Sequence, residues 1–127
     1  MLGERVDAVP GGKGYDHNLC VDGPNSARGA GDPSRGLSPV ADLICDTTGI
    51  ALSLWADQPG CQLYVGGFLD GEPGKGGAVY PKFGGLCLET QTWPDGLNHA
   101  KNGFPSPVLR PGQEYEHNMV VQFTTLP

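Results

Sequence analysis

Apolar and polar residues alternate with a period of two along several short stretches of the chain. The clearest stretch is 50–55, where Ile50, Leu52 and Leu54 alternate with Ala, Ser and Trp. Such a period is typical of a β-strand with one buried face. The same pattern predicts further strands over residues 15–21, 62–67, 86–91 and 115–123. Turn-forming residues separate most of these segments, at 57–60, 70–74, 94–96 and 110–112.

No segment keeps a 3.6-residue apolar period, so we expect an all-β, antiparallel protein of sandwich or barrel type. Residues 22–39 are rich in Gly, Pro, Ser and Asp and poor in apolar side chains, which predicts a surface loop. The 127 residues contain no internal repeat and no clear boundary. We therefore expect one domain, or a piece of one, over residues 1–127.

Charge and composition exclude several classes of partner. The chain carries 14 acidic and 8 basic residues, a formal net charge of -6, which repels nucleic-acid phosphates and anionic lipid surfaces. Its apolar runs are far shorter than the roughly 20 residues that span a bilayer, and no apolar signal-like segment follows residues 1–5. We expect a soluble, cytoplasmic protein that binds neither nucleic acid nor membrane.

The cysteines and histidines do not have the sequence spacing of a metal site. Cys20, Cys45, Cys61 and Cys87 include no Cys-x-x-Cys pair, so we expect reduced and largely buried thiols. His99 and His117 lie in no metal-ligand spacing, and we expect surface or structural histidines.

A few polar residues lie where a site could form. Glu89 falls in the middle of an apolar strand. Its carboxylate therefore faces a solvated cleft or is held by hydrogen-bond donors, unless Glu89 is an ordinary exposed strand residue. Asp16 either binds a ligand or forms a local Asx-type hydrogen bond. Polar-tipped or aromatic side chains that could contact a sugar, or belong to the core or its rim, are Gln62, Tyr64, Trp55 and Trp93.

Local segments in one order resemble the C-terminal half of the aldose 1-epimerase (galactose mutarotase) family. They are GYDHNL at 14–19, PGCQLY at 59–64, GGFLDG at 66–71 followed by GK at 74–75, GLCLETQ at 85–91 and LRPGQEY at 109–115. The most specific are LETQ at 88–91 and PDGLNH at 94–99. The resemblance implies an antiparallel β-sandwich of galactose mutarotase-like type, and it implies that this chain is the C-terminal part of it.

The resemblance also implies roles for three residues. Glu89 matches the family's general base, Asp16 its substrate-binding aspartate and Gln62 a glutamine that lines the site. Interconverting the α and β anomers of an aldose such as galactose or glucose requires loss of the C1 hydroxyl proton and protonation of the ring oxygen. Glu89 would remove that proton from a partly desolvated site, and Asp16 would orient the hexose by accepting hydroxyl hydrogen bonds. No metal or organic cofactor is required.

The acid of this family is a histidine from the upstream half, and His17, His99 and His117 do not match it. We therefore expect an incomplete site, with a missing N-terminal segment or self-association covering open strand edges and exposed apolar surface. Two other functions stay open. One is a noncatalytic carbohydrate-binding or structural module of the same fold. The other is a glycoside hydrolase, because paired carboxylates also fit that reaction, although the LETQ context weighs against it.

Overall fold

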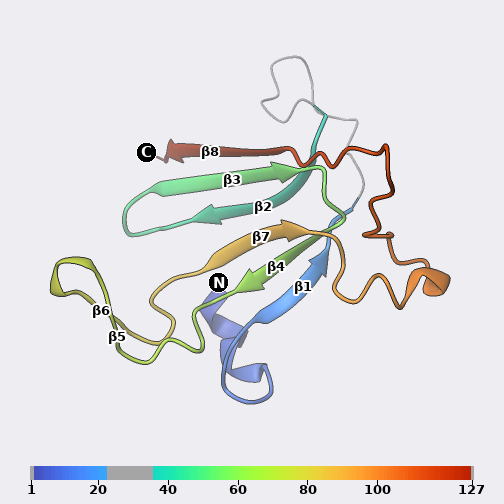
Figure 1. The fold of residues 1–127 in the computed structure, drawn as a ribbon. Helices are drawn as coiled ribbons and strands as arrows, with labels where there is room; N and C mark the ends of the chain where they lie inside the picture. Colours follow the sequence, from blue (N-terminus) through green and yellow to red (C-terminus); the bar gives the residue numbers. More distant parts are fainter. Residues whose placement is uncertain (1, 23–35, 127) are drawn as a thin grey trace. The chain divides into compact units, whose positions relative to one another are not determined.

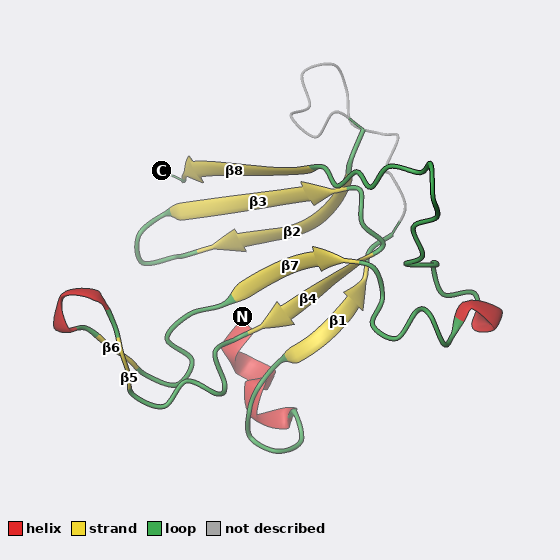
Figure 2. Ribbon diagram, in the orientation of Figure 1, coloured by secondary structure: helices red, strands yellow, loops and turns green. Residues whose placement is uncertain are grey.

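The computed structural model describes residues 2–22 and 36–126 (Figure 1). Strands dominate this part of the chain, accompanied by short 3-10 helices and no α-helix (Figure 2). The strands are β1 (Asp16–Cys20), β2 (Ser38–Ile44), β3 (Ile50–Ala56), β4 (Gly60–Tyr64), β5 (Glu72–Pro73), β6 (Val79–Tyr80), β7 (Cys87–Gln91) and β8 (Met119–Thr125). The 3-10 helices are η1 (Leu2–Ala8), η2 (Lys75–Gly77) and η3 (Ala100–Asn102). The predicted all-β fold is confirmed.

The strands form sheets with the orders β1-β4-β7, β2-β3-β8 and β5-β6. In the second sheet β3 pairs antiparallel with both neighbours, and Leu54 lies opposite Ala41 on β2 and Val121 on β8. The described chain divides into two compact units, one with residues 1–19 and 62–89 and the other with residues 20–61 and 90–127. The single domain expected from the sequence stays a prediction.

The core of the second unit lies around the end of β3. Leu54, Trp55 and Ala56 are 3%, 4% and 0% exposed. Because consecutive strand residues point to opposite faces, this end of β3 is covered on both faces. The alternation predicted one buried face only, and Ile50 on that face is 52% exposed. Trp55 is therefore a core residue and not a surface on which a sugar could stack.

In the first unit, glycines allow the segment before β1 to pack closely. A Cβ on Gly14, where φ is +67°, would lie only 2.7–2.9 Å from Val6, Val65 and Phe83. A Cβ on Gly67 would overlap the carbonyl oxygen of Lys13. These contacts, together with the hydrogen bond from the Val65 N–H to the Tyr15 carbonyl oxygen (3.1 Å), fix the backbone at the start of β1.

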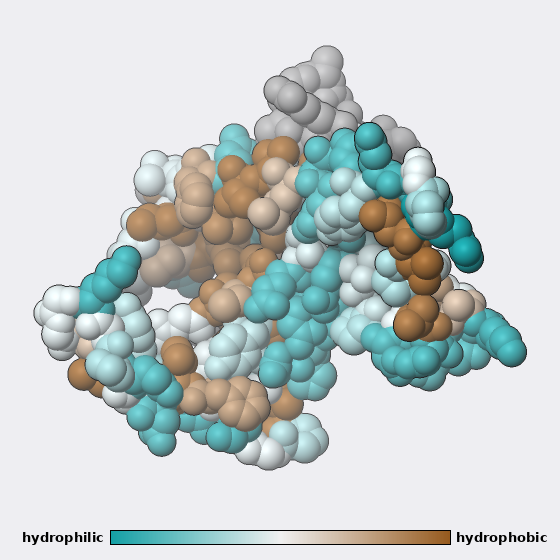
Figure 3. All heavy atoms as spheres, in the orientation of Figure 1, coloured by the Kyte–Doolittle hydropathy of each residue, from teal (hydrophilic) through white to brown (hydrophobic). Residues whose placement is uncertain are grey.

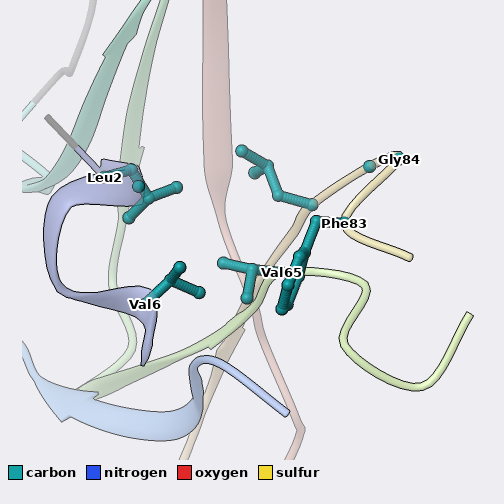
Figure 4. A pocket seen from close by; sticks show the side chains of 8 residues that line it. Leu2, Val6, Val65, Phe83 and Gly84 are labelled. Carbon is teal, nitrogen blue, oxygen red and sulfur yellow. The ribbon is translucent and has the colours of Figure 1, made fainter. Parts of the chain in front are cut away.

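An apolar cavity of about 350 Å³ lies beside this packing (Figure 4). Leu2 and Val6 of η1 line it together with Val65, Phe83 and Leu86. It contains no carboxylate, amide or hydroxyl side chain among its described lining residues. Sugar hydroxyls would find no side-chain partner there.

Several boundaries differ from the sequence predictions. The sequence did not predict β2. Its first residues, Ser38 and Pro39, fall in the predicted loop 22–39. The predicted end of that loop is therefore wrong, because these two residues pair with β3. The rest of that loop, residues 23–35, lies outside the described residues. β4 ends at Tyr64 because Gly66 turns the chain at φ +70°, and β8 begins only at Met119.

The cysteines are free thiols, as expected, but most are not buried. Cys61 is buried, whereas Cys20, Cys45 and Cys87 are exposed. The prediction of largely buried thiols is therefore wrong for three of the four, because their strand and turn positions face solvent. Separately, none of the helices in the described residues is long and apolar enough to cross a membrane. The cytoplasmic location stays a prediction.

Candidate functional site

Asp16 and Gln62, two of the three residues assigned to the site, contact each other directly. Gln62 Nε2 donates a hydrogen bond of 2.7 Å to Asp16 Oδ1. Asp16 is the first residue of β1 and Gln62 is the middle residue of β4, and the two strands are neighbours in their sheet. Sheet formation therefore brings together a carboxylate and an amide that are distant in the sequence.

The backbone around Asp16 is held by its neighbours. The Asp16 N–H donates to His17 Nδ1 at 3.0 Å, and the carbonyl oxygen of Tyr15 accepts from Val65. Sequence reasoning assigned no role to His17, and its position directly after Asp16 was the only signal that could have suggested one. These contacts hold the backbone at Asp16 in place.

The pair is suited to binding hydroxyl groups. Asp16 is exposed, and its second oxygen, Oδ2, accepts no hydrogen bond from the described residues. A carboxylate oxygen has two acceptor positions, so Asp16 can accept from more than one donor while the Gln62 amide fixes its orientation. A polyol such as a sugar supplies donors of this kind.

Glu89 lies on the third strand of the same sheet. It is the central residue of β7, which follows β4 in the order β1-β4-β7. Its side chain is exposed and makes no hydrogen bond or ion pair with the described residues. The described chain therefore does not supply the partly desolvated surroundings that we expected for a general base, although it leaves the carboxylate open to a ligand.

The aromatic candidates have contacts within the fold. Tyr64 Oη accepts from the Phe68 N–H at 3.1 Å, and the two rings stack with centroids 6.2 Å apart. Trp93 Nε1 donates to the Pro59 carbonyl oxygen at 2.7 Å, and its ring packs edge-on against Phe104. Both side chains therefore stabilise local structure, and neither is free to reorient toward a ligand.

His99 and His117 also have local partners. His99 Nε2 lies 3.0 Å from Asp95 Oδ2, and both side chains are substantially exposed. His117 Nε2 lies 2.8 Å from Thr90 Oγ1. Within the described residues, no three or more His, Cys, Asp or Glu side chains are grouped so that they could hold a metal ion.

Comparison with known proteins gives consistent matches over most of the chain. A family model described as aldose 1-epimerase matches residues 2–122. Galactose mutarotase from Homo sapiens is 43% identical over 112 residues, which cover 87% of this chain and 29% of that protein. Aldose 1-epimerase from Escherichia coli (strain K12) is 33% identical over 111 residues, covering 87% of this chain and 30% of that protein.

A solved structure agrees with these sequence matches. The GalM/aldose epimerase homologue from C. elegans superposes with a TM-score of 0.71 at 27% identity, covering 89% of this chain and 30% of that one. This likeness confirms the fold class predicted from the sequence. The chain spans less than a third of the length of each of these relatives.

Proposed function

Because this chain belongs to the aldose 1-epimerase family, we propose that it supplies the general base and the substrate-orienting residues of an enzyme that interconverts the α and β anomers of a hexose such as galactose or glucose. The observation that carries the proposal is the 2.7 Å hydrogen bond between Gln62 on β4 and Asp16 on β1, in the sheet whose third strand, β7, carries Glu89 next to β4. This arrangement offers fixed acceptors for hydroxyls and an open carboxylate on one sheet.

In the proposed reaction, Glu89 takes the proton from the C1 hydroxyl as the ring opens to the aldehyde. Asp16 accepts hydrogen bonds from other hydroxyls of the sugar, which restricts its orientation relative to the base. After rotation about the C1–C2 bond, Glu89 returns the proton when the ring closes on the other face. No metal or organic cofactor takes part in the proposed reaction.

The ring oxygen also needs a proton donor. We assign this acid to a partner segment, because His17, His99 and His117 have local contacts in the described structure and none matches the family's acid in sequence. Such a segment could be joined upstream or supplied by a separate polypeptide. Mixing this chain with the upstream part of a relative would test the assignment through a gain in rate.

Polarimetry tests the proposal directly. Fresh α-D-galactose or α-D-glucose is followed as it relaxes to its anomeric equilibrium. The wild-type chain and the Glu89→Gln variant are each measured alone and together with the upstream part of a relative. Loss of a general base lowers the catalysed rate by about 100-fold or more. Glu72→Gln is the matched control, because Glu72 is exposed on β5 and, among the described residues, only accepts a backbone hydrogen bond from Asp70. Equal rates for wild-type and Glu89→Gln chains contradict the proposed role of Glu89.

A noncatalytic sugar-binding module is the second candidate function. It is favoured by the exposure of Glu89, which has no hydrogen-bond partner among the described residues. Sugar binding without any acceleration of mutarotation, even with the upstream part present, would support this module. Release of reducing sugar from a glycoside would instead favour a hydrolase.

A further inference from the structure

A second cavity lies in the second unit. It measures about 360 Å³ and is lined by residues 90–92 at the end of β7, by residues 106–109 and 114–116, and by Gln58. Asp16, Gln62 and Glu89 do not line it. Its size falls in the range of small-molecule sites, which is roughly 300–1,000 Å³.

The most deeply buried polar side chain among the described lining residues is that of Gln58. Gln58 is only 9% exposed, and its Nε2 donates to Asp57 Oδ1 at 2.9 Å. That bond fixes which way the amide points, and the Gln58 Oε1 accepts no hydrogen bond from the described residues. This oxygen can therefore accept a hydrogen bond from a ligand that carries a hydroxyl or amine.

The charge around the cavity is negative. Glu114 and Glu116 line it, and no Lys, Arg or His does so among the described residues. Glu116 Oε1 accepts from Asn118 Nδ2 at 2.8 Å, whereas Glu114 has no hydrogen bond or ion pair with any described residue. Asp57 adds a third carboxylate behind Gln58. A cationic group is therefore attracted, and a phosphate or carboxylate is repelled.

The cavity also offers an aromatic face. Tyr115 is 69% exposed, and its hydroxyl lies 3.4 Å from His117 Nδ1, which holds the end of the side chain. Val108 and Leu109 add apolar surface to the lining. An exposed ring beside carboxylates can hold the C–H face of a sugar or a bound ammonium group.

We propose that this cavity is a second binding site that takes an amino sugar, a hydroxylated ring with a protonated amine. The amine pairs with Glu114, a hydroxyl or the amine donates to Gln58 Oε1, and the ring packs on Tyr115. The site does not depend on the proposed epimerase activity, so it holds equally for a noncatalytic module. A bare metal ion fits less well, because the described residues provide no group of ligands for one.

Calorimetric titration of the full chain with D-galactosamine, D-galactose and D-galactose 6-phosphate tests the proposal. We expect galactosamine to bind at least about tenfold more tightly than the phosphate at this site. Glu114→Gln, an exposed change that keeps the side-chain shape, should weaken galactosamine about tenfold. Asp46→Asn removes an equal charge from the exposed turn after β2, outside the cavity lining, and should leave binding unchanged.

Asp16→Asn separates the two sites. Galactosamine binding that survives Asp16→Asn and weakens in Glu114→Gln supports the second site, whether or not the chain is an epimerase. Binding that is lost in Asp16→Asn and unchanged in Glu114→Gln overturns it and assigns the amino sugar to the first site. No galactosamine binding, or equal affinity for the phosphate, also overturns it. Tyr115→Leu is an independent test, because it removes the aromatic ring on which the sugar is proposed to pack. Circular dichroism shows whether this variant keeps its fold.

Discussion

Gln62 on β4 donates its side-chain amide to the carboxylate of Asp16 on β1, although the two residues are 46 positions apart. The amide can point in only one direction while it makes this bond, and one carboxylate oxygen is occupied. The remaining oxygen, Oδ2, is therefore presented in a defined orientation. An oriented acceptor binds a hydroxyl with less loss of side-chain entropy than a freely rotating one.

Replacing Gln62 tests this relationship. Gln62→Leu keeps a side chain of similar size but removes the donor to Asp16, so we expect the dissociation constant for galactose to rise about tenfold, equivalent to about 1.4 kcal/mol. The affinity can be measured by NMR titration. Gln122→Leu on exposed β8 is the matched control and should bind as the wild type. Unchanged affinity in Gln62→Leu would show that the hydrogen bond does not organise the site.

Local patterns were sufficient to predict most of the strands. β1, β3 and β7 follow the alternation of their own residues, because the period of two is a property of each strand by itself. β2 was missed because its residues are held by pairing with β3, a contact that alternation within 38–44 does not reveal. Tertiary pairing thus decided the structure of a segment with weak local preference.

The site shows the same limit. The motifs around Asp16, Gln62 and Glu89 identified candidate residues, but only the strand order β1-β4-β7 places them on neighbouring strands. The Gln62–Asp16 bond could not be predicted, because it depends on register between strands distant in sequence. The structural contacts of Tyr64 and Trp93 likewise became visible only with the turns that surround them.

Gly67 should be intolerant of any side chain. In Gly67→Ala the new Cβ would overlap the carbonyl oxygen of Lys13, so the backbone before β1 would have to move. We expect a loss of about 1–3 kcal/mol in the free energy of unfolding, as for other overpacked sites. Chemical denaturation measures it. Gly85→Ala, where a Cβ meets nothing within 4 Å, should change stability by less than about 0.5 kcal/mol. Equal stability of the two variants would contradict the close approach.

Strand β8 should promote self-association. It ends the sheet order β2-β3-β8, and Met119, Val121 and Phe123 are 53%, 42% and 69% exposed. Figure 3 shows apolar side chains, in brown, on the visible surface. Exposed apolar edge strands pair with other chains. We expect Phe123→Lys to raise the monomer fraction measured by sedimentation velocity. Thr124→Lys, on the opposite face of the strand, should raise the monomer fraction less. A monodisperse wild-type monomer would contradict this.

Cys45 should be the most reactive thiol at neutral pH. Hydrogen bonding from the Thr47 side chain, and then from Thr48, lowers the pKa of Cys45 from 9.0 to about 7. The Sγ lies 3.2 Å from Thr47 Oγ1 and is exposed. The rate of alkylation by iodoacetamide, followed by mass spectrometry, should therefore rise with pH and reach half its maximum near about pH 7.

Thr47→Val should move that midpoint of Cys45 alkylation to higher pH, because it removes the first of the hydrogen bonds. Thr124→Val on β8 is the control and should leave it unchanged. Between pH 7 and 9 the folded thiol of Cys45 binds fewer protons than the unfolded one, because folding lowers its pKa from 9.0 to about 7. Its contribution to the free energy of unfolding is therefore complete above pH 9.0 and is lost as pH falls through about 7. An unchanged midpoint in Thr47→Val would exclude the hydroxyl as the cause.

Asp57 should anchor the entry to β8 in a pH-dependent way. Burial opposes its ionisation, but hydrogen bonds from Gln58 and Asn118 and the charge of His117 outweigh this and hold the pKa of Asp57 below its usual value of 3.8. Its Oδ2 accepts from the Asn118 N–H at 2.7 Å and from the Asn118 Nδ2 at 3.1 Å. Asp57→Ala removes these acceptors and should lower the free energy of unfolding by about 1–2 kcal/mol at neutral pH.

Because the folded pKa of Asp57 is lowered, its contribution is complete above the unfolded value and is lost as pH falls through the folded value. The stability gap between wild type and Asp57→Ala, measured by denaturant unfolding, should therefore narrow as the pH falls below about 4. Asp42→Ala is the matched control, because within the described part of the chain Asp42 Oδ1 accepts only from Ser53 Oγ on the neighbouring strand. The stability difference between wild type and Asp42→Ala should be smaller at neutral pH, because this substitution removes fewer hydrogen bonds. A gap for Asp57→Ala that stays constant from neutral to acid pH would mean that the ionised carboxylate is not what holds Asn118.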